Sequence, residues 1–159
     1  MKRKVLFGDC DPAGIVYTPR VAYYVVESIH EIFDRKLGGS ALGAIFAMDI
    51  VPPARNLTID YTYPMRWGDE LEISVRVKEV RSRSFTFAVE AVLVSAGPER
   101  VVAFTGTLTQ VCASPKTLQP IEIPPELRAT LESMLAENAW PVSPRQGSSL
   151  VERGGLAEP

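Results

Sequence analysis

The chain has 159 residues, of which 46% are hydrophobic, a length and composition typical of one globular domain with a real core. Its net charge of −2 excludes the strongly basic surface that bulk nucleic-acid binding requires, so no nucleic-acid partner is expected. Two cysteines are too few for a disulfide framework, and the single histidine cannot supply a zinc site, so no metal is expected.

No apolar run reaches membrane-spanning length. The richest stretch, residues 41–50, is short and contains Asp49. The basic start of the chain meets Asp9 and Asp11 before an apolar segment typical of a signal peptide can form. We therefore expect a cytoplasmic protein with no membrane partner.

A long amphipathic helix is predicted in the first quarter of the chain. From Val21 to Phe33 the apolar residues recur at the i, i+3, i+4 and i+7 spacing of a buried helix face. Pro19 suits the first turn, where a missing N–H costs nothing, and the glycine pair that begins at Gly38 ends the helix. The first turn therefore presents free backbone N–H groups to the preceding loop.

Two aspartates stand in that loop, after a short strand expected over residues 5–7. Asp9 and Asp11 are two residues apart, so in an extended chain their side chains point the same way and each raises the pKa of the other. Asp11 has two interpretations: it caps the helix or closes the turn, or it acts on a substrate carbonyl that the helix N–H groups polarise. The residues alone favour the first.

The middle of the chain alternates apolar and polar residues, as strands with one covered face do. Strands are predicted over residues 57–63, 71–77, 85–93 and 101–111. With the first strand this makes five strands and one long helix, which indicates an α+β fold with the helix packed on one face of an antiparallel sheet.

Residues 37–50 are predicted to form an apolar loop that either packs over the core or walls a pocket beside the acidic turn, with Phe46 and Met48 as candidate contacts of the acyl group. A short helix is expected from Pro124 to about residue 137. The remainder is rich in Pro, Gly, Ser and charge, which predicts little fixed structure. The expected organisation is one domain over residues 1–136 and a poorly ordered C-terminal tail over residues 137–159.

The stretch Gly8–Tyr17 reads GDCDPAGIVY. It resembles the signature loop of the 4-hydroxybenzoyl-CoA thioesterase family, in which an aspartate precedes a run of Ala/Pro, Ala/Gly, Gly, Val/Ile, Val and Tyr/Trp. The similarity continues through residues 63–71, 106–109 and 121–124. The resemblance implies a hotdog fold, in which a five-stranded antiparallel sheet wraps around the long central helix and protomers pair into dimers and often tetramers.

The same resemblance implies an acyl-CoA thioesterase that hydrolyses a small aryl- or acyl-CoA thioester to the free acid and CoA. It identifies Asp11 as the catalytic carboxylate, acting as nucleophile or general base, with Asp9 as a supporting residue. It assigns the oxyanion contact to the backbone N–H of Tyr17 or, preferably, of Thr18, a position where many relatives carry histidine. No cofactor is expected, because CoA is part of the substrate.

Further contacts with the substrate follow from the resemblance. The basic hairpin with Arg81, Arg83 and Ser84 is either a solvated turn or the site that holds the CoA phosphates, which Arg binds with paired hydrogen bonds. Glu27 is either a solvated or interface residue or, as in another clade of hotdog thioesterases, a helix carboxylate at the substrate. Tyr24 belongs first to the core or pocket wall and second to the ligand contacts.

Two other functions are alternatives. One is a non-catalytic acyl-CoA-binding hotdog module, which would have the same fold. Fold does not determine function, so the resemblance leaves this alternative open. A hotdog dehydratase or hydratase normally needs a histidine beside its carboxylate, whereas His30 lies in the middle of the predicted helix. The expected partners are the acyl-CoA substrate and further copies of the chain, as a dimer or a dimer of dimers; the sequence does not indicate the acyl group.

Overall fold

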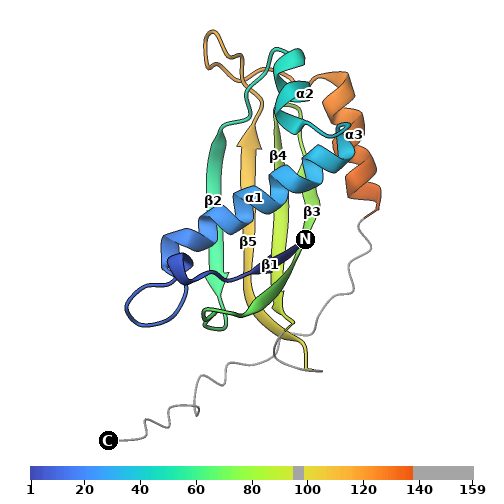
Figure 1. Cartoon of the computed structure of the whole chain (residues 1–159). Coiled ribbons are helices and arrows are strands. Elements are labelled where there is room, and N and C mark those ends of the chain that lie inside the picture. The colour runs from blue at the N-terminus through green and yellow to red at the C-terminus, as the bar shows by residue number, and fades with distance from the viewer. Residues whose placement is uncertain (95–98, 138–159) are drawn as a thin grey trace, which may run out of the picture.

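The computed structural model describes residues 1–94 and 99–137. One long helix crosses one face of a five-stranded antiparallel sheet with strand order β1-β3-β4-β5-β2 (Figure 1). In chain order the elements are β1 (Lys2–Lys4), η1 (a single 3-10 turn, Phe7–Asp9), α1 (Thr18–Lys36), α2 (Ala41–Ala47), β2 (Ala54–Tyr61), β3 (Glu70–Val80), β4 (Ser84–Leu93), β5 (Val101–Val111) and α3 (Pro125–Ala136). The predicted α+β class is confirmed.

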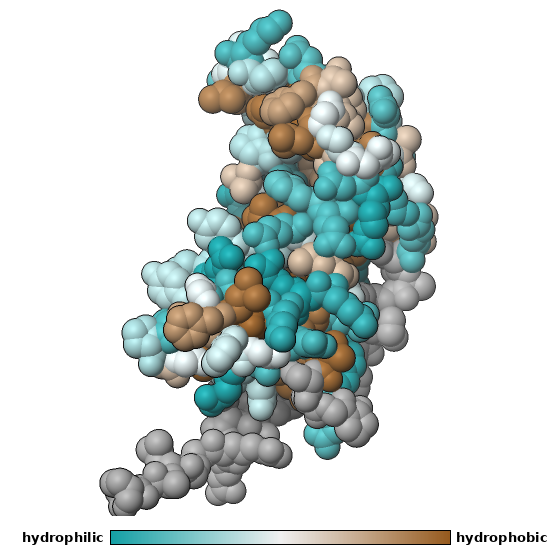
Figure 2. Space-filling model, in the orientation of Figure 1, coloured by the Kyte–Doolittle hydropathy of each residue, from teal (hydrophilic) through white to brown (hydrophobic). Residues whose placement is uncertain are grey.

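The core lies between α1 and the sheet. The buried side chains of α1 are Val21, Tyr24, Val25, Ser28, Ile29 and Phe33. Phe33 meets Phe85 and Phe87 of β4 edge to face, with ring centroids 6.3 and 5.2 Å apart. Such aromatic contacts add directional stabilisation to the burial of apolar area, so they fix where α1 crosses the sheet. The outward face of α1 is mostly hydrophilic (Figure 2).

The sheet approaches α1 most closely at a glycine of β5. A Cβ atom at Gly106 would lie 3.0 Å from the carbonyl oxygen of Thr58 in β2 and 3.7 Å from a methyl group of Val25 in α1. A larger residue would push either β2 or the helix away. Gly106 therefore sets how tightly the curved sheet packs around the helix.

The first strand lies earlier than predicted, and residues 5–7 do not form a strand. Asp9 accepts a hydrogen bond from the N–H of Leu6, with Oδ2 3.0 Å from the nitrogen. This side-chain bond closes a turn, so the chain leaves the sheet after Lys4 and Phe7 is exposed.

The predicted loop over residues 37–50 contains the short helix α2. Ser40 caps this helix by accepting the N–H of Gly43 at 3.1 Å, and this local bond outweighs the glycine-rich composition. Helix α2 follows the C-terminal end of α1, far from the acidic loop (Figure 1). Hydrophobic residues gather over α2 (Figure 2), among them Phe46, which is 60% exposed. They do not wall the acidic loop of the same chain.

The short C-terminal helix is confirmed as α3, which packs against β3. Residues 95–98, between the strands predicted over 85–93 and 101–111, and the predicted tail from residue 138 onward lie outside the described residues. Within the part of the chain that the structure describes, no helix is both long enough and apolar enough to cross a membrane.

Candidate active site

The acidic loop, residues 10–16, joins η1 to α1 as a tight hairpin. The N–H of Asp11 donates to the carbonyl of Ile15 at 2.9 Å, and the N–H of Gly14 donates back to the carbonyl of Asp11 at 2.9 Å. Gly14 has a φ of 75°, a left-handed conformation that favours glycine. The loop is therefore closed by its own backbone, and it holds Asp11 in a defined place.

Asp11 is half-buried and uses one side of its carboxylate. Oδ1 accepts the N–H of Ala13 at 2.9 Å, which closes an Asx turn. Oδ2 accepts no hydrogen bond from any residue that the structure describes. The turn-closing interpretation therefore accounts for one oxygen, while the second is available to a ligand.

The start of α1 offers a backbone N–H beside this loop. The N–H of Tyr17 donates to the carbonyl of Asp9 at 2.8 Å, and Pro19 has no N–H. The N–H of Thr18 lies between them and has no acceptor within residues 1–94 and 99–137. The carbonyl of Thr18 accepts the hydroxyl of Tyr61 at 3.1 Å. Of the two predicted oxyanion donors, only Thr18 is available.

Asp9 has a different environment from Asp11: it is 2% exposed. Its carboxylate accepts hydrogen bonds from the N–H of Leu6 at 3.0 Å, Nε of Arg20 at 2.6 Å and the hydroxyl of Tyr24 at 2.7 Å. Burial alone raises the pKa of Asp9, but these hydrogen bonds outweigh it and hold the pKa below its usual value. The expectation that the two aspartates raise each other's pKa is therefore wrong for Asp9.

Tyr24 and Glu27 both contact Arg3 on the N-terminal half of α1. Tyr24 is fully buried, its hydroxyl bonds to Asp9, and the guanidinium of Arg3 lies 3.9 Å from the centre of its ring. Burial, and secondly the bond to Asp9, raise the pKa of Tyr24. The side chain of Glu27 is 42% exposed and forms an ion pair with Arg3. Tyr24 is thus a core residue, whereas Glu27 is a surface carboxylate that already has a partner.

The basic hairpin lies at the far end of β3 from the acidic loop. Arg81 is 68% exposed and pairs with Glu79 at 2.9 Å, Arg83 is exposed, and Ser84 is half-buried. Arg128 of α3 anchors the hairpin by donating to the carbonyl of Arg81 at 2.8 Å. β3 has 11 residues, which at about 3.3 Å each span about 35 Å. One protomer therefore does not bring Arg81 or Arg83 near the acidic loop.

Sequence patterns missed the aromatic surface around the acidic loop. Its exposed members are Phe7, Tyr17, Tyr61, Tyr63 and Trp67. Phe7 and Trp67 meet edge to face with ring centroids 5.8 Å apart. Tyr61 falls on the apolar side of a predicted strand, so the pattern placed it in the core, yet it is 50% exposed in the protomer. The sequence feature that indicates this surface is the group of aromatic residues at and after the end of β2: Tyr61, Tyr63 and Trp67.

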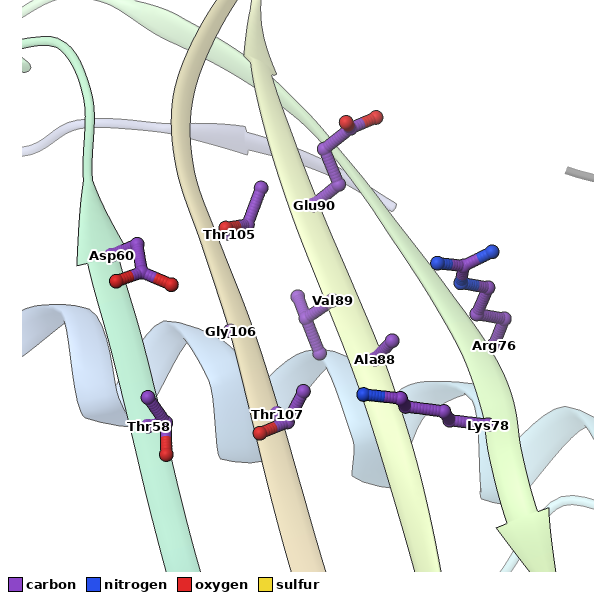
Figure 3. A pocket seen from close by; sticks show the side chains of 10 residues that line it. All are labelled: Thr58, Asp60, Arg76, Lys78, Ala88, Val89, Glu90, Thr105, Gly106 and Thr107. Atoms are coloured by element: carbon purple, nitrogen blue, oxygen red, sulfur yellow. The ribbon is translucent and has the colours of Figure 1, made fainter. Parts of the chain in front are cut away.

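A hollow of about 280 Å³ lies on the opposite face of the sheet from α1 (Figure 3). Its charged lining residues are Asp60, Arg76, Lys78 and Glu90. It contains none of the predicted catalytic residues, so it is separate from the site around Asp11. No cluster of three or more His, Cys, Asp or Glu that could hold a metal ion occurs within residues 1–94 and 99–137.

Two known proteins are similar to this chain in sequence. A 1,4-dihydroxy-2-naphthoyl-CoA hydrolase of Picosynechococcus sp. is 26% identical over 137 residues, which cover 83% of this chain and 90% of that protein. The acyl-CoA thioester hydrolase YbgC of Escherichia coli is 26% identical over 127 residues, covering 79% of this chain and 90% of that protein.

Solved structures show the same fold. A 1,4-dihydroxy-2-naphthoyl-CoA thioesterase from Synechocystis matches with a TM-score of 0.74 at 18% identity, over 84% of this chain and 95% of that one. A thioesterase superfamily protein from Jannaschia sp. matches with a TM-score of 0.76 at 24% identity, over 85% and 91%. The family model of the Thioesterase-like superfamily matches residues 5–131. The chain therefore belongs to the Thioesterase-like superfamily and has the hotdog fold that the resemblance of its acidic loop predicted.

Proposed function

We propose that the chain is an acyl-CoA thioesterase that hydrolyses a small aryl- or acyl-CoA thioester to the free acid and CoA. One observation carries the proposal: Asp11 in the acidic loop and Thr18 directly after it both keep a group without a partner among the described residues, a carboxylate oxygen and a backbone N–H respectively. The names of the two curated relatives support it, because both are hydrolases of CoA thioesters.

The proposed mechanism uses Asp11 against the thioester carbonyl carbon. As a nucleophile, its Oδ2 forms a bond to that carbon, the C–S bond breaks, and water hydrolyses the resulting anhydride. As a general base, it takes a proton from a water molecule whose oxygen attacks instead, and the proton passes on to the CoA thiolate. In either path the N–H of Thr18 donates to the developing oxyanion, and the positive end of the α1 dipole adds to this stabilisation.

The substrate contacts in the proposal come from more than one protomer. Strand β2 lies at the edge of the sheet and is exposed along most of its length, with Leu57 38% exposed. An unpaired edge with apolar side chains fits pairing with a second copy of the chain. In such a dimer, or dimer of dimers, Arg81 and Arg83 of one protomer hold the CoA phosphates while Asp11 of another acts on the thioester.

The proposal needs no cofactor beyond the CoA of the substrate, and it assumes a cytoplasmic setting, where CoA esters are available. The geometry does not favour a dehydratase. His30 is exposed and lies 12 residues beyond Thr18 on α1, which at about 1.5 Å per residue is about 18 Å. No histidine among the described residues therefore stands beside the Asp11 carboxylate.

Replacement of Asp11 by Asn tests the proposal. Asp11→Asn and the wild type are assayed on a panel of aryl- and alkyl-CoA esters by the release of free CoA thiol. We expect kcat to fall at least about 100-fold while CoA binding is kept, because the amide is neither a base nor a nucleophile of comparable strength. Asp34→Asn is the matched control, since Asp34 also accepts a backbone N–H, that of Ala41 at 2.7 Å, at the other end of α1.

The outcomes separate the alternatives. Wild-type turnover by Asp11→Asn would show that the mechanism is wrong. Tight binding of CoA esters by the wild type without thiol release would identify a binding module. Trapping of an Asp11 anhydride would select the nucleophilic path.

A further inference from the structure

Asp9 is a buried charge that the proposed chemistry does not use. Its carboxylate accepts three hydrogen bonds from three different places: Leu6 before η1, Arg20 in the first turn of α1 and Tyr24 in the second. A buried carboxylate is retained at low cost only when its oxygens are satisfied in this way. The side chain of Asp9 therefore ties the chain that enters the acidic loop to the helix that leaves it.

The backbone of the same residue makes a fourth link. The carbonyl of Asp9 accepts the N–H of Tyr17 at 2.8 Å. Asp9 stands directly before the loop and Tyr17 directly after it, so this bond closes the loop at its base. The two groups that act in the proposal lie close to this bond: Asp11 is two residues after Asp9, and Thr18 is one residue after Tyr17. Any shift of Asp9 relative to α1 therefore changes the spacing of that pair.

We propose that Asp9 is a positioning residue that sets the distance between the Asp11 carboxylate and the Thr18 N–H; this rests on the proposed thioesterase function. Asp9 does not touch the substrate and acts through the loop. In catalysis a misplacement of about 1 Å costs about 100-fold in rate. The effect of Asp9 is therefore expected in turnover rather than in substrate binding.

The ionised carboxylate matters because all three partners are hydrogen-bond donors. An asparagine of the same shape has one acceptor oxygen and an amide NH₂, which would face a donor, either Arg20 or Leu6. One donor then loses its partner and the contact becomes repulsive. Asp9→Asn thus changes the charge and the loop position with little change in side-chain volume.

The test measures kcat, KM and amide hydrogen exchange for Asp9→Asn, with Asp34→Asn as the matched control. Kinetics are recorded well below the unfolding temperature of each variant. We expect Asp9→Asn to lower kcat 10- to 100-fold with KM changed less than threefold. The Tyr17 N–H should exchange at least about tenfold faster, because the loop opens more often. Asp34→Asn should leave kcat, KM and the exchange of Tyr17 unchanged.

Arg20→Met covers the case in which Asp9→Asn does not fold. It removes the partly exposed Arg20 donor and keeps the bonds from Leu6 and Tyr24, so the fold is expected to survive with a smaller loss of kcat. The proposal is overturned if the folded variants keep kcat within twofold of the wild type, or if the exchange of Tyr17 is unchanged. A wild type that releases no CoA would mark failure of the thioesterase proposal; the exchange of Tyr17 would then still decide the role of Asp9.

Discussion

At the scale of single residues, two aspartates two positions apart have opposite environments. Asp9 is buried and accepts three hydrogen bonds, whereas Asp11 is half-buried and keeps one oxygen open. A buried carboxylate needs donors to stay charged, while a reactive one needs access to the substrate. In the proposed mechanism the loop divides these requirements between the two residues, so Asp9 can be satisfied without blocking Asp11.

The low pKa of Asp9 predicts a pH dependence of stability. Burial opposes the charge, but the bonds from Leu6, Tyr24 and Arg20 keep the folded pKa below the unfolded value of about 3.9. The unfolded chain therefore binds the proton first as the pH falls. The stability that Asp9 contributes is fully present well above pH 4 and is lost as the pH falls through the folded pKa.

Urea unfolding of the wild type and Asp9→Asn between pH 7 and pH 3 measures this contribution. We expect the difference in unfolding free energy between the two to be constant above about pH 5 and to narrow below about pH 4. Asp34→Asn serves as the control for other acidic groups. A difference that stayed constant down to pH 3 would contradict the lowered pKa.

At the scale of elements, the sequence predicted the strands and helices that are marked by neighbouring residues, either by regular alternation of apolar and polar side chains or by a residue typical of a helix start. The strand predicted over residues 85–93 is β4 (Ser84–Leu93), and the one predicted over 101–111 is β5 (Val101–Val111). Both alternate regularly, because one face is buried against the core. The start of α1 was predicted to within one residue, since Pro19 marks a first turn.

The predictions from sequence are wrong where a side chain bonds to the backbone and where a strand lies at the surface of the protomer. The bond from the N–H of Leu6 to Asp9 replaces a predicted strand by a turn, and the cap by Ser40 replaces a predicted loop by α2. In β2 the alternation predicted a covered face, but in a single protomer both faces are exposed. Periodicity indicates that a face is covered without indicating what covers it.

The candidate site was predicted only in part, because some of its contacts join residues that are far apart in the sequence. The motif identified Asp11 and the two possible oxyanion donors. It could not indicate that Tyr24 bonds to Asp9, 15 residues away, or that Tyr61 bonds to Thr18, 43 residues away. These contacts depend on how elements pack. So does the bond from the N–H of Tyr17 to the carbonyl of Asp9, which leaves Thr18 as the available donor.

The hairpin between β3 and β4 carries a prediction about the substrate nucleotide. Arg81 and Arg83 are exposed, and the backbone of the hairpin is anchored by Arg128 independently of their side chains. Replacing both by Ala should therefore keep the fold and weaken CoA binding about tenfold, with a corresponding rise in KM and little change in kcat. Calorimetric titration with CoA at two salt concentrations measures this effect.

The salt dependence separates charge from shape. The difference between the wild type and the double variant should shrink at high salt, because screening weakens contacts with phosphate. Arg35→Ala, which removes a 60% exposed arginine from α1, is the control. Equal CoA affinity of the wild type and the double variant would show that the hairpin is only a solvated turn.

At the scale of the whole molecule, the acidic loop and the basic hairpin lie at opposite ends of the sheet of one protomer. The loop packs on residues just before β3, where the N–H of Val16 donates to the carbonyl of Met65 at 2.8 Å, and the hairpin follows the end of the same strand. If both contact one substrate, they belong to different protomers. The exposed edge strand β2 supplies a surface through which two copies can pair.

Mixing two defective variants tests this arrangement. Asp11→Asn lacks the carboxylate that the proposal makes reactive, and the Arg81→Ala/Arg83→Ala variant lacks the proposed phosphate contacts. In a mixed dimer one site carries both defects and the other carries neither. After denaturation and refolding of an equimolar mixture, half of the dimers are mixed, so roughly a quarter of the sites should be intact.

The measurement is turnover at substrate concentrations far below KM, where both parent variants are slow. We expect the refolded mixture to exceed the mean of its parents several-fold and to approach about a quarter of the wild-type rate. The same variants mixed without refolding provide the baseline. A refolded mixture that matched the mean of its parents would show that each site draws its carboxylate and its arginines from a single chain, or that Arg81 and Arg83 do not serve the substrate.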